Sequence, residues 1–516
     1  MSPGSQIPAT LSGSDVVGAG TRETMIDPNL AERAVGSLTV SDLLNEAPRS
    51  RFHRRAVVIS GAGFFTDAYD LFVISTVAAL VTKQWNLSTT QTSWVTGSAI
   101  LAAFIGAILF GRLADIIGRK RIYVIVALIM IAGALASAVA PNFAWLVVAR
   151  FVLGLGIGGD YPVSAVLMSE YSNRADRGRF VGLVFSMQAL GLIVGPLVAL
   201  ILLVSGVGHD LTWRLLLAFG ALPAAAVIYL RSRMPESPRF RARVRGESIE
   251  AALDAASFSE GAVAAAETAP EGIRRISLRQ FLTQSRMLVL LVATAGTWFL
   301  FDYAYYGNTL SLPAILKDVD PGATLVTKLV WTLGIFVVFA LPGYAMAVAR
   351  MDRIGHRRLQ HIGFAVIAIA FIVLGAVHEL TAAVAPFLAV FGLSYFFIEF
   401  GPNTTTFVLP SEVFPVSMRT TGHGIAAGVG KLGAFVGVFL VPQLELHIGL
   451  RGMLLVAGTA ATAGFLLTSV LPEPARRSLE AISGEDEADG VPVPARVLYD
   501  DDTRHVPARG ELAAET

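Results

Sequence analysis

The chain has 516 residues, of which 54% are hydrophobic and only 15% are charged, whereas an ordinary soluble domain has roughly a quarter of its residues charged. This composition excludes a water-soluble enzyme and a disordered chain, because so many apolar side chains require contact with lipid. The net charge of +1 provides no field that would attract nucleic acid, and the absence of cysteine excludes disulfides and thiolate chemistry.

The first 55 residues are polar and lack the basic-then-apolar design of a cleaved signal peptide. Apolar segments near the length that crosses a bilayer, about 20 residues, then follow one another. We therefore predict an all-α integral membrane protein with twelve transmembrane helices in two six-helix bundles. The predicted spans are 56–80, 93–111, 122–140, 144–168, 180–204, 212–230, 287–307, 324–349, 360–377, 382–409, 422–442 and 450–471.

Basic residues gather in alternate loops, which predicts that those loops are cytoplasmic. They are Arg112, Arg119, Lys120, Arg121, Arg174, Arg177, Arg179, Arg350, Arg353, Arg357, Arg358 and Arg419. The predicted parts are then a cytoplasmic tail at 1–55, bundles at 56–230 and 287–471, a cytoplasmic linker at 231–286 and a cytoplasmic tail at 472–516. Within the linker, 246–270 has the composition of a short surface helix, and the polar C-terminal tail is expected to be mobile.

Two loops of the halves match each other. The loop after the second span has Asp115 followed three residues later by a glycine and a basic cluster, and the loop after the eighth span repeats this pattern from Asp352. The fourth and tenth spans both end in Ser-Glu, at Glu170 and Glu412, with arginine following. Equivalent elements at equivalent helix ends indicate an internal duplication, as many transporters have.

Seven charged residues fall inside the predicted spans, where each costs about 2.5–3.5 kcal/mol to insert. They are Asp67, Asp70, Arg150, Asp160, Asp302, Glu399 and Lys431. Buried ion pairs that fix helix register are the alternative explanation, which fits Arg150 or Lys431 alone better than it fits the set. The set as a whole indicates a polar path through the membrane.

The spacing of these residues suggests how they work. Asp67 and Asp70 are three residues apart and share a helix face, and two nearby carboxylates resist joint ionisation, which suits a proton carrier. Trp298, Asp302 and Tyr306 are spaced four and four, so they form one hydrogen-bonding stripe. A Gly-Pro pair beside Asn403 should loosen the tenth span and leave backbone groups facing a cavity.

Two other patterns lead away from cofactor chemistry. Gly154, Gly156 and Gly159 match the dinucleotide-binding pattern, but they lie in an apolar span, where small residues allow close helix packing instead. The eight histidines lie mostly near loops and show no metal-ligand spacing. We therefore expect no cofactor, no metal site and no enzymatic activity.

The motifs resemble those of the major facilitator superfamily. The loop after the second span (GRLADIIGRK), residues 150–154 (RFVLG) and residues 235–239 (PESPR) carry this resemblance, which extends over 51–475. Within the superfamily, five further segments are similar to the phosphate/proton symporters of fungi and plants. They are 61–70 (GAGFFTDAYD), 158–164 (GGDYPVS), 296–302 (GTWFLFD), 400–407 (FGPNTTTF) and 423–433 (HGIAAGVGKLG).

The resemblance implies roles for individual residues. It places phosphate among Tyr161, Gln188, Trp298, Asp302, Tyr306 and Asn403. The expected proton-coupling residues are Asp67, Asp70, Asp160, Arg150 and Lys431, with Lys431 paired to Asp67. One departure is Glu399, where the family usually has asparagine, and an extra acid one turn from Asn403 leaves the substrate open.

The predicted function is proton-coupled import of inorganic phosphate by alternating access, in a monomer that spans the cell (inner) membrane with both termini cytoplasmic. A proton-coupled symporter of an organic acid or a sugar-like metabolite is the alternative within the same class. A non-transporting nutrient receptor is less favoured, because the polar cytoplasmic segments are too short for a folded signalling domain.

Overall fold

Eleven helices in the described residues, 39–258 and 275–485 of the computed structural model, are long and apolar enough to cross a membrane. The first half contains α3 (Arg51–Trp85), α4 (Thr89–Ile117), α5 (Arg119–Ala138), α6 (Phe143–Tyr171), α7 (Arg177–Ser186) continued by α8 (Gln188–Val204), and α9 (His209–Phe219) continued by α10 (Ala221–Ser232). The second half contains α14 (Ser285–Leu310), α16 (Leu325–Ile335) with η2 (Phe336–Ala340) and α17 (Leu341–Ile354), α18 (His356–Ala376), α20 (Val384–Ile398) with η3 (Glu399–Asn403), α21 (Thr404–Val408) and α22 (Pro410–Val413), and α23 (Arg419–Thr468).

The last of these helices, α23, accounts for two predicted spans. It has 50 residues, and Gly449 inside it has a φ of 70° and a ψ of 173°, which is not helical. Glycine adopts this backbone conformation without the steric cost that a side chain would add. The chain therefore reverses at Gly449, all twelve predicted spans are present, and the described residues contain no strand.

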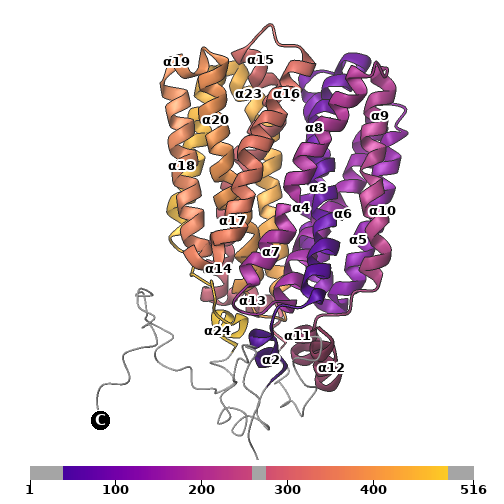
Figure 1. The fold of residues 1–516 in the computed structure, drawn as a ribbon, viewed down its shortest axis with the longest axis vertical. Helices are drawn as coiled ribbons and strands as arrows, with labels where there is room; N and C mark the ends of the chain where they lie inside the picture. Colours follow the sequence, from indigo (N-terminus) through magenta and orange to yellow (C-terminus); the bar gives the residue numbers. More distant parts are fainter. Residues whose placement is uncertain (1–38, 259–274, 486–516) are drawn as a thin grey trace, which may run out of the picture.

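The two halves lie side by side (Figure 1), with α3–α10 on one side and α14–α23 on the other. Contact between the halves runs along α4 and α23, where glycines let the backbones approach closely. A Cβ atom on Gly111 would lie 2.8 Å from the Thr420 carbonyl oxygen, and one on Gly424 would lie 2.4 Å from the Ala107 carbonyl oxygen. These glycines hold the halves together at one end of the bundle.

Short helices cover that same end of the bundle (Figure 1). They are α2 (Val40–Glu46), α11 (Pro238–Phe240), η1 (Arg241–Arg245), α12 (Ser248–Phe258), α13 (Leu278–Thr283) and α24 (Leu479–Ser483), while α15 (Leu312–Val319) and α19 (His378–Thr381) lie at the other end. The helix α12 confirms part of the surface helix expected over 246–270, the rest of which lies outside the described residues. The expectation of a mobile tail is wrong for its first part, because Leu479 is fully buried and Glu480 is 3% exposed.

The internal repeat predicted from the loops is visible in the backbone. Gly118 and Gly355 have φ values of 107° and 101° and precede α5 and α18. In the first half, Glu236 accepts hydrogen bonds from the backbone N–H groups of Arg119 and Lys120. In the second half, Glu473 accepts from the backbone N–H groups of His356 and Arg357. Each carboxylate thus caps the positive N-terminus of an equivalent helix.

The glycines of α6 pack closely against the neighbouring helices α4 and α5. A Cβ atom on Gly154 would lie 2.0 Å from the Ala99 carbonyl oxygen, and one on Gly158 would lie 2.1 Å from the Ala103 carbonyl oxygen. Gly156 and Gly159 similarly face Val126 of α5. The packing explanation of the glycine pattern is confirmed, since α6 touches the backbones of both its neighbours.

We predict that Gly158→Ala destabilises the protein by about 1–3 kcal/mol, because the added methyl group must push α4 and α6 apart. Thermal unfolding in detergent, followed by intrinsic fluorescence, measures the effect. Gly208→Ala is the matched control, because no atom lies within 4 Å of a Cβ placed there. Equal melting temperatures for the two variants would contradict the packing role of Gly158.

Candidate functional site

A buried ion pair lies at the centre of the candidate site. The Lys431 Nζ atom of α23 donates to Asp302 Oδ2 of α14 at 3.0 Å and to the Tyr306 hydroxyl at 2.9 Å. Lys431 and Tyr306 are each 2% exposed and Asp302 is 1% exposed. An ammonium group and a carboxylate can remain charged at this depth because each partly replaces the water that the other has lost.

Aromatic rings surround the ammonium group. It lies 4.6 Å from the ring centroid of Tyr161 in α6 and 4.3 Å from that of Tyr306. Trp298, one turn before Asp302 on α14, packs against Gly430, where a Cβ atom would lie 2.5 Å from the indole Cδ1 atom. The absence of a side chain at Gly430 therefore lets the indole lie directly against α23, beside the ion pair.

A chain of hydrogen bonds beside this centre links the first half to the second. Gln188 Nε2 donates to the Tyr161 hydroxyl at 3.0 Å, and the Tyr344 hydroxyl donates to Gln188 Oε1 at 3.4 Å. Asn403 Nδ2 donates to the Tyr344 hydroxyl at 2.8 Å and also to Glu399 Oε2. Because Gln188 lies on α8 and Tyr344 on α17, the chain joins the two halves across the site.

The break predicted beside Asn403 is present. Residues Glu399–Asn403 form the π-helical turn η3, and Gly401 inside it has a φ of −111° and a ψ of −109°. Pro402 adds to the distortion, because it has no N–H group to donate. The turn directs Asn403 and Glu399 toward the same hydroxyl-rich layer.

The structure brings together the six residues predicted to bind substrate. Tyr161, Gln188, Trp298, Asp302, Tyr306 and Asn403 are all at most 4% exposed, and contacts connect them through Lys431 and Tyr344. Sequence reasoning missed Tyr344, which supplies the link between Gln188 and Asn403. Its sequence signal is weak, since a single tyrosine within an apolar span also fits ordinary packing.

A second polar cluster lies inside the first half. Arg231 at the end of α10 makes two hydrogen bonds to Asp160, at 2.7 and 3.1 Å, and stacks 4.0 Å from the Tyr123 ring centroid. Gly63 of α3 leaves room for this pair, because a Cβ atom there would lie 1.8 Å from the Arg231 Nη2 atom. The sequence placed Arg231 in the linker, so its role as the partner of Asp160 was not predicted.

The carboxyl groups of α3 have no hydrogen-bond partners. Both oxygens of Asp67 and both oxygens of Asp70 are buried and unpaired. Asp67 lies within electrostatic reach of Asp160, Arg231 and Lys431. Arg150 donates to the backbone oxygen of Asp70 at 2.7 Å rather than to its carboxylate. Unpaired buried carboxyl groups are costly when ionised, so this cluster is suited to holding protons.

The predicted pair between Lys431 and Asp67 is wrong for this conformation. Lys431 pairs with Asp302, and Asp67 has no hydrogen-bond partner. The physical reason is helix packing: α14 and α23 pack along their length, with Gly430, Gly433 and Gly437 of α23 against the side chain or backbone of α14. Asp302 is therefore presented to the lysine directly by the adjacent helix.

Charges also close the end of the bundle that carries the short helices. Glu170 Oε1 at the end of α6 contacts Arg119 Nη2 at 3.3 Å and Arg419 Nη1 of the second half at 3.2 Å. Asp115 accepts from both the backbone and the hydroxyl of Thr421 at 2.6 Å. These contacts join the two halves at this end of the bundle.

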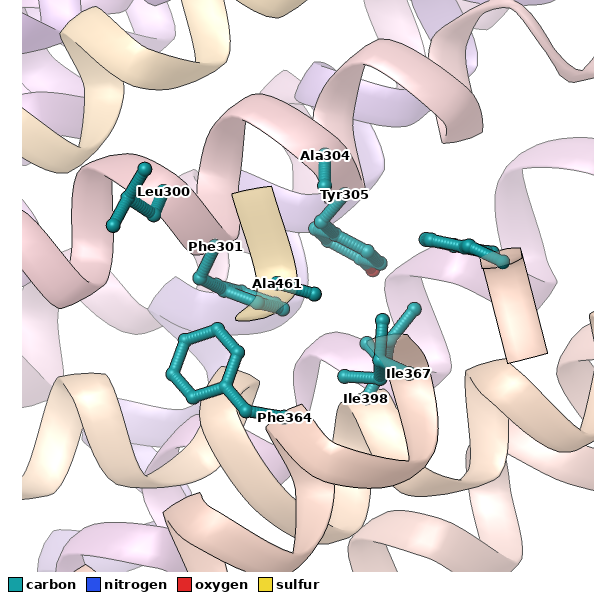
Figure 2. A pocket seen from close by; sticks show the side chains of 9 residues that line it. Leu300, Phe301, Ala304, Tyr305, Phe364, Ile367, Ile398 and Ala461 are labelled. Atoms are coloured by element: carbon teal, nitrogen blue, oxygen red, sulfur yellow. The ribbon is translucent and has the colours of Figure 1, made fainter. Parts of the chain in front are cut away.

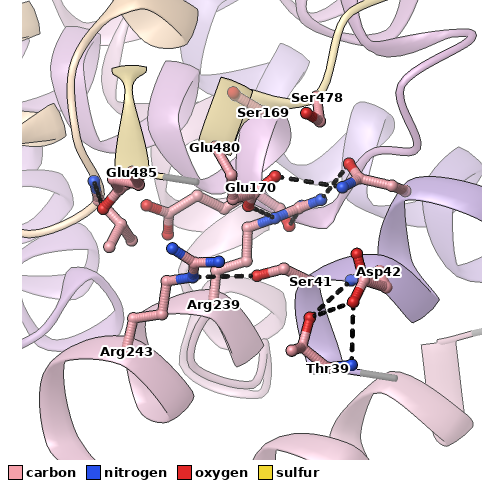
Figure 3. A network of polar contacts seen from close by, with 12 residues as sticks. Thr39, Ser41, Asp42, Ser169, Glu170, Arg239, Arg243, Ser478, Glu480 and Glu485 are labelled. Atoms are coloured by element: carbon pink, nitrogen blue, oxygen red, sulfur yellow. Dashed lines mark hydrogen bonds and ion pairs between the residues drawn. The ribbon is translucent and has the colours of Figure 1, made fainter. Parts of the chain in front are cut away.

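The C-terminal helix α24 contributes to this closure (Figure 3). Glu480 Oε1 accepts from Arg239 Nε at 3.1 Å, and Glu480 Oε2 accepts from Asn45 Nδ2 at 3.1 Å. Burial opposes ionisation of Glu480, but Arg239, Arg243 and Arg419 outweigh it and hold its pKa well below the ordinary value. Glu480 is therefore ionised at neutral pH and ties α24 to α2 and α11.

A small pocket lies beside the site but lacks the chemistry for a polar substrate (Figure 2). It is lined by Leu300, Phe301, Ala304, Tyr305, Phe364, Ile367, Phe371, Ile398 and Ala461. Tyr305 supplies the one polar side chain in this lining, so the pocket offers too few hydrogen bonds for an anion or a sugar. The donor-rich layer around Lys431 is the stronger candidate for the binding site.

Comparisons with known proteins agree with this arrangement. The family model described as "Sugar (and other) transporter" matches residues 55–485. Inorganic phosphate transporter 1-11 of Oryza sativa subsp. japonica is 36% identical, with 87% of this chain and 91% of the relative covered. Low affinity inorganic phosphate transporter 5 of Petunia hybrida is also 36% identical, with 88% and 96% covered.

A solved structure has the same fold. The proton:xylose symporter XylE bound to 6-bromo-6-deoxy-D-glucose superposes with a TM-score of 0.71 at 20% sequence identity, covering 85% of this chain and all of that chain. The inward-open XylE structure gives a lower TM-score of 0.60. The chain therefore has the same overall arrangement of helices as these solved structures.

We predict that Asp302→Asn destabilises the protein by about 3–5 kcal/mol, because it leaves the Lys431 ammonium group buried without a counter-charge. Adding Lys431→Met should recover part of the loss, and melting temperatures of the single and double variants measure this coupling. In the matched cycle, Asp67→Asn and Lys431→Met should show a smaller coupling, because no hydrogen bond joins these two residues. A double Asp302/Lys431 variant no more stable than Asp302→Asn would contradict the pair.

We predict that Glu480→Gln lowers stability at neutral pH, that the difference from wild type begins to shrink as the pH falls below about 4, and that it is lost only when the pH falls through the lowered native-state pKa. The sign follows from the lowered pKa: the native state favours the ionised form, so its stabilisation is present above the unfolded-state pKa and is lost on acidification. Melting curves across a pH series test this. Glu46→Gln is the control, because its ion pair with Arg174 is exposed and should contribute at most about 1 kcal/mol.

Proposed function

Because the chain belongs to the sugar (and other) transporter family, within the major facilitator superfamily, we propose that it carries inorganic phosphate across the membrane together with protons. It is a multi-pass membrane transporter, and similarity over 87% of its length to proteins named inorganic phosphate transporters supports the substrate. The observation that carries the proposal is the buried ammonium group of Lys431 within a layer of hydrogen-bond donors.

That layer has the chemistry a phosphate ion requires. Phosphate presents several acceptor oxygens and a negative charge, so it needs many donors and one or more cations. Lys431, Trp298, Tyr161, Gln188 and Asn403 offer N–H or O–H groups within one connected set. Asp302 neutralises the lysine in this conformation, and an entering anion competes for the same ammonium group.

We assign proton coupling to the buried carboxyl groups of the first half. Asp67, Asp70 and Asp160 are buried, and only Asp160 has an arginine pair in this conformation. Protonation of an unpaired carboxyl group removes the cost of a bare buried charge. We assign Arg150 and Lys431 to the same coupling system, because Arg150 lies against α3 and Lys431 acts electrostatically on Asp67.

The topology follows the positive-inside rule. We place the end that carries α2, α12 and α24 in the cytoplasm, with both termini, and the transporter in the cell (inner) membrane as a monomer. The proposed parts remain a tail at 1–55, bundles at 56–230 and 287–471, a linker at 231–286 and a tail at 472–516. In this orientation, the contacts of Glu170 with Arg119 and Arg419 close the cytoplasmic side.

A second candidate is proton-coupled symport of a sugar-like metabolite or an organic acid. The similarity of fold to a proton:xylose symporter favours it, as do the amide groups of Gln188 and Asn403, which suit hydroxyl ligands. A carboxylate-bearing substrate would equally use the Lys431 ammonium group. The test below therefore includes these substrates.

We predict that purified protein in liposomes accumulates radiolabelled phosphate when the outside pH is lower than the inside pH. Coupling by linkage requires this, because bound protons and bound phosphate stabilise the same loaded state. A protonophore should abolish accumulation, and replacing external potassium with sodium should have no effect.

Liposomes that hold the Lys431→Met protein, adjusted to equal reconstituted amount, are the control for leak. Accumulation driven by a sodium gradient at fixed pH, insensitive to protonophore, would contradict proton coupling. Accumulation of labelled xylose or an organic acid with no uptake of phosphate would support the second candidate instead.

A further inference from the structure

Glu399 stands apart from the ion pair at the centre of the site. It begins the turn η3 and has no exposed surface. Its Oε2 atom accepts a hydrogen bond from Asn403, one turn away, and its Oε1 atom has no hydrogen-bond partner. Asn403 is one of the residues proposed to bind phosphate. The Glu399 carboxyl group therefore lies in contact with the proposed phosphate site.

No cation neutralises Glu399 in the described part of the chain. The titratable groups that face it are the hydroxyls of Tyr305 on α14, Tyr344 on α17 and Tyr395 on α20. From α18, the nearby Gln360 amide is engaged by Thr405 and Thr468. The ammonium group of Lys431 is already paired with Asp302.

The carboxyl groups of Asp302 and Glu399, both in the second half and close to the site, therefore differ in their electrostatics. Asp302 can remain ionised, because Lys431 lies 3.0 Å from it. An ionised Glu399 would be a buried negative charge with no cation to balance it, in a site that is proposed to accept an anion, which is unfavourable. A neutral Glu399 removes that repulsion and offers an O–H donor.

The protonation state of Glu399 also decides what Asn403 can donate. Asn403 Nδ2 bonds both to Glu399 Oε2 and to the Tyr344 hydroxyl, so its amide hydrogens are occupied. A carboxylate holds such a donor strongly, since hydrogen bonds to charged groups are about twice as strong as neutral ones. Binding a proton to Glu399 weakens that bond and frees the amide for a ligand. Through Tyr344 and Gln188, the change reaches the first half.

Resting on the proposed function, we propose that Glu399 is a second proton-binding site of the transport cycle. It takes up one proton from solvent when phosphate binds and releases that proton when phosphate leaves. The carboxylate oxygen gains the O–H bond on loading and loses it on unloading, and no other bond changes. Each phosphate carried therefore brings one proton on Glu399 in addition to those bound by the first half.

Titration calorimetry of phosphate binding to the full-length protein in nanodiscs tests this. Repeating the titration in buffers with different ionisation enthalpies gives the number of protons taken up per phosphate. We expect Glu399→Gln to retain phosphate binding and to take up about one proton fewer than wild type. The fall in its affinity with rising pH should be shallower by up to about tenfold per pH unit, the effect of one linked proton.

Two controls separate proton binding from a structural effect. Glu379→Gln, an exposed glutamate of the same half, should keep the wild-type proton count. Infrared difference spectra of the substrate-free protein across a pH series should contain carbonyl stretches of buried protonated carboxyl groups, and Glu399→Gln should lose one component while those of Asp67 and Asp70 remain. If Glu399→Gln does not fold, Glu399→Asn takes its place in both measurements.

An unchanged proton count together with an unchanged infrared spectrum in the variant would overturn the assignment of Glu399. This outcome would leave the proposal of phosphate transport intact. Failure of the wild type to bind phosphate at all would instead overturn the proposed function. The infrared titration would still decide whether Glu399 binds a proton, because it needs no substrate.

Discussion

A lysine and an aspartate can stay charged inside a membrane when each serves as the counter-ion of the other, and the pair of Lys431 and Asp302 meets this condition. The rest of the central site is organised around it. Close packing of α23 on α14 through glycine brings the two side chains together, and tyrosine rings from both halves enclose the ammonium group. An anion that reaches this layer can interact with the Lys431 ammonium group in competition with Asp302.

The buried charges of the molecule include ion pairs and carboxyl groups without partners. One set of paired charges, Glu170 between Arg119 and Arg419, lies at one end of the bundle and joins the two halves. Carboxyl groups without partners, such as those of Asp67 and Asp70, lie in the interior beside the proposed path. In the proposed transport cycle, the contacts of Glu170 separate when this end opens, and the unpaired carboxyl groups bind protons when the site is loaded.

Hydropathy located the twelve spans within a few residues, because the thickness of a bilayer limits the length of apolar segments. Motif spacing likewise predicted the repeat around Asp115 and Asp352. The pairing of residues on different helices was harder to predict from the sequence. Lys431 could pair with a carboxylate on α3 or on α14, and only the packing of α23 decides between them. Arg231 resembled a loop arginine because it ends its span, and Tyr344 had no distinguishing neighbour in sequence. The polar composition of the C-terminal tail concealed Glu480, whose burial depends on arginines far away in the chain.

Binding of radiolabelled phosphate to the purified protein, with unlabelled competitors, tests the central claim most directly. If the layer around Lys431 is a phosphate site, unlabelled phosphate displaces the label, whereas xylose does not. Lys431→Met should then weaken binding by roughly tenfold to a hundredfold, the value of a hydrogen bond to a charged group. Displacement of the label by xylose, or wild-type affinity in the Lys431→Met protein, would contradict the account.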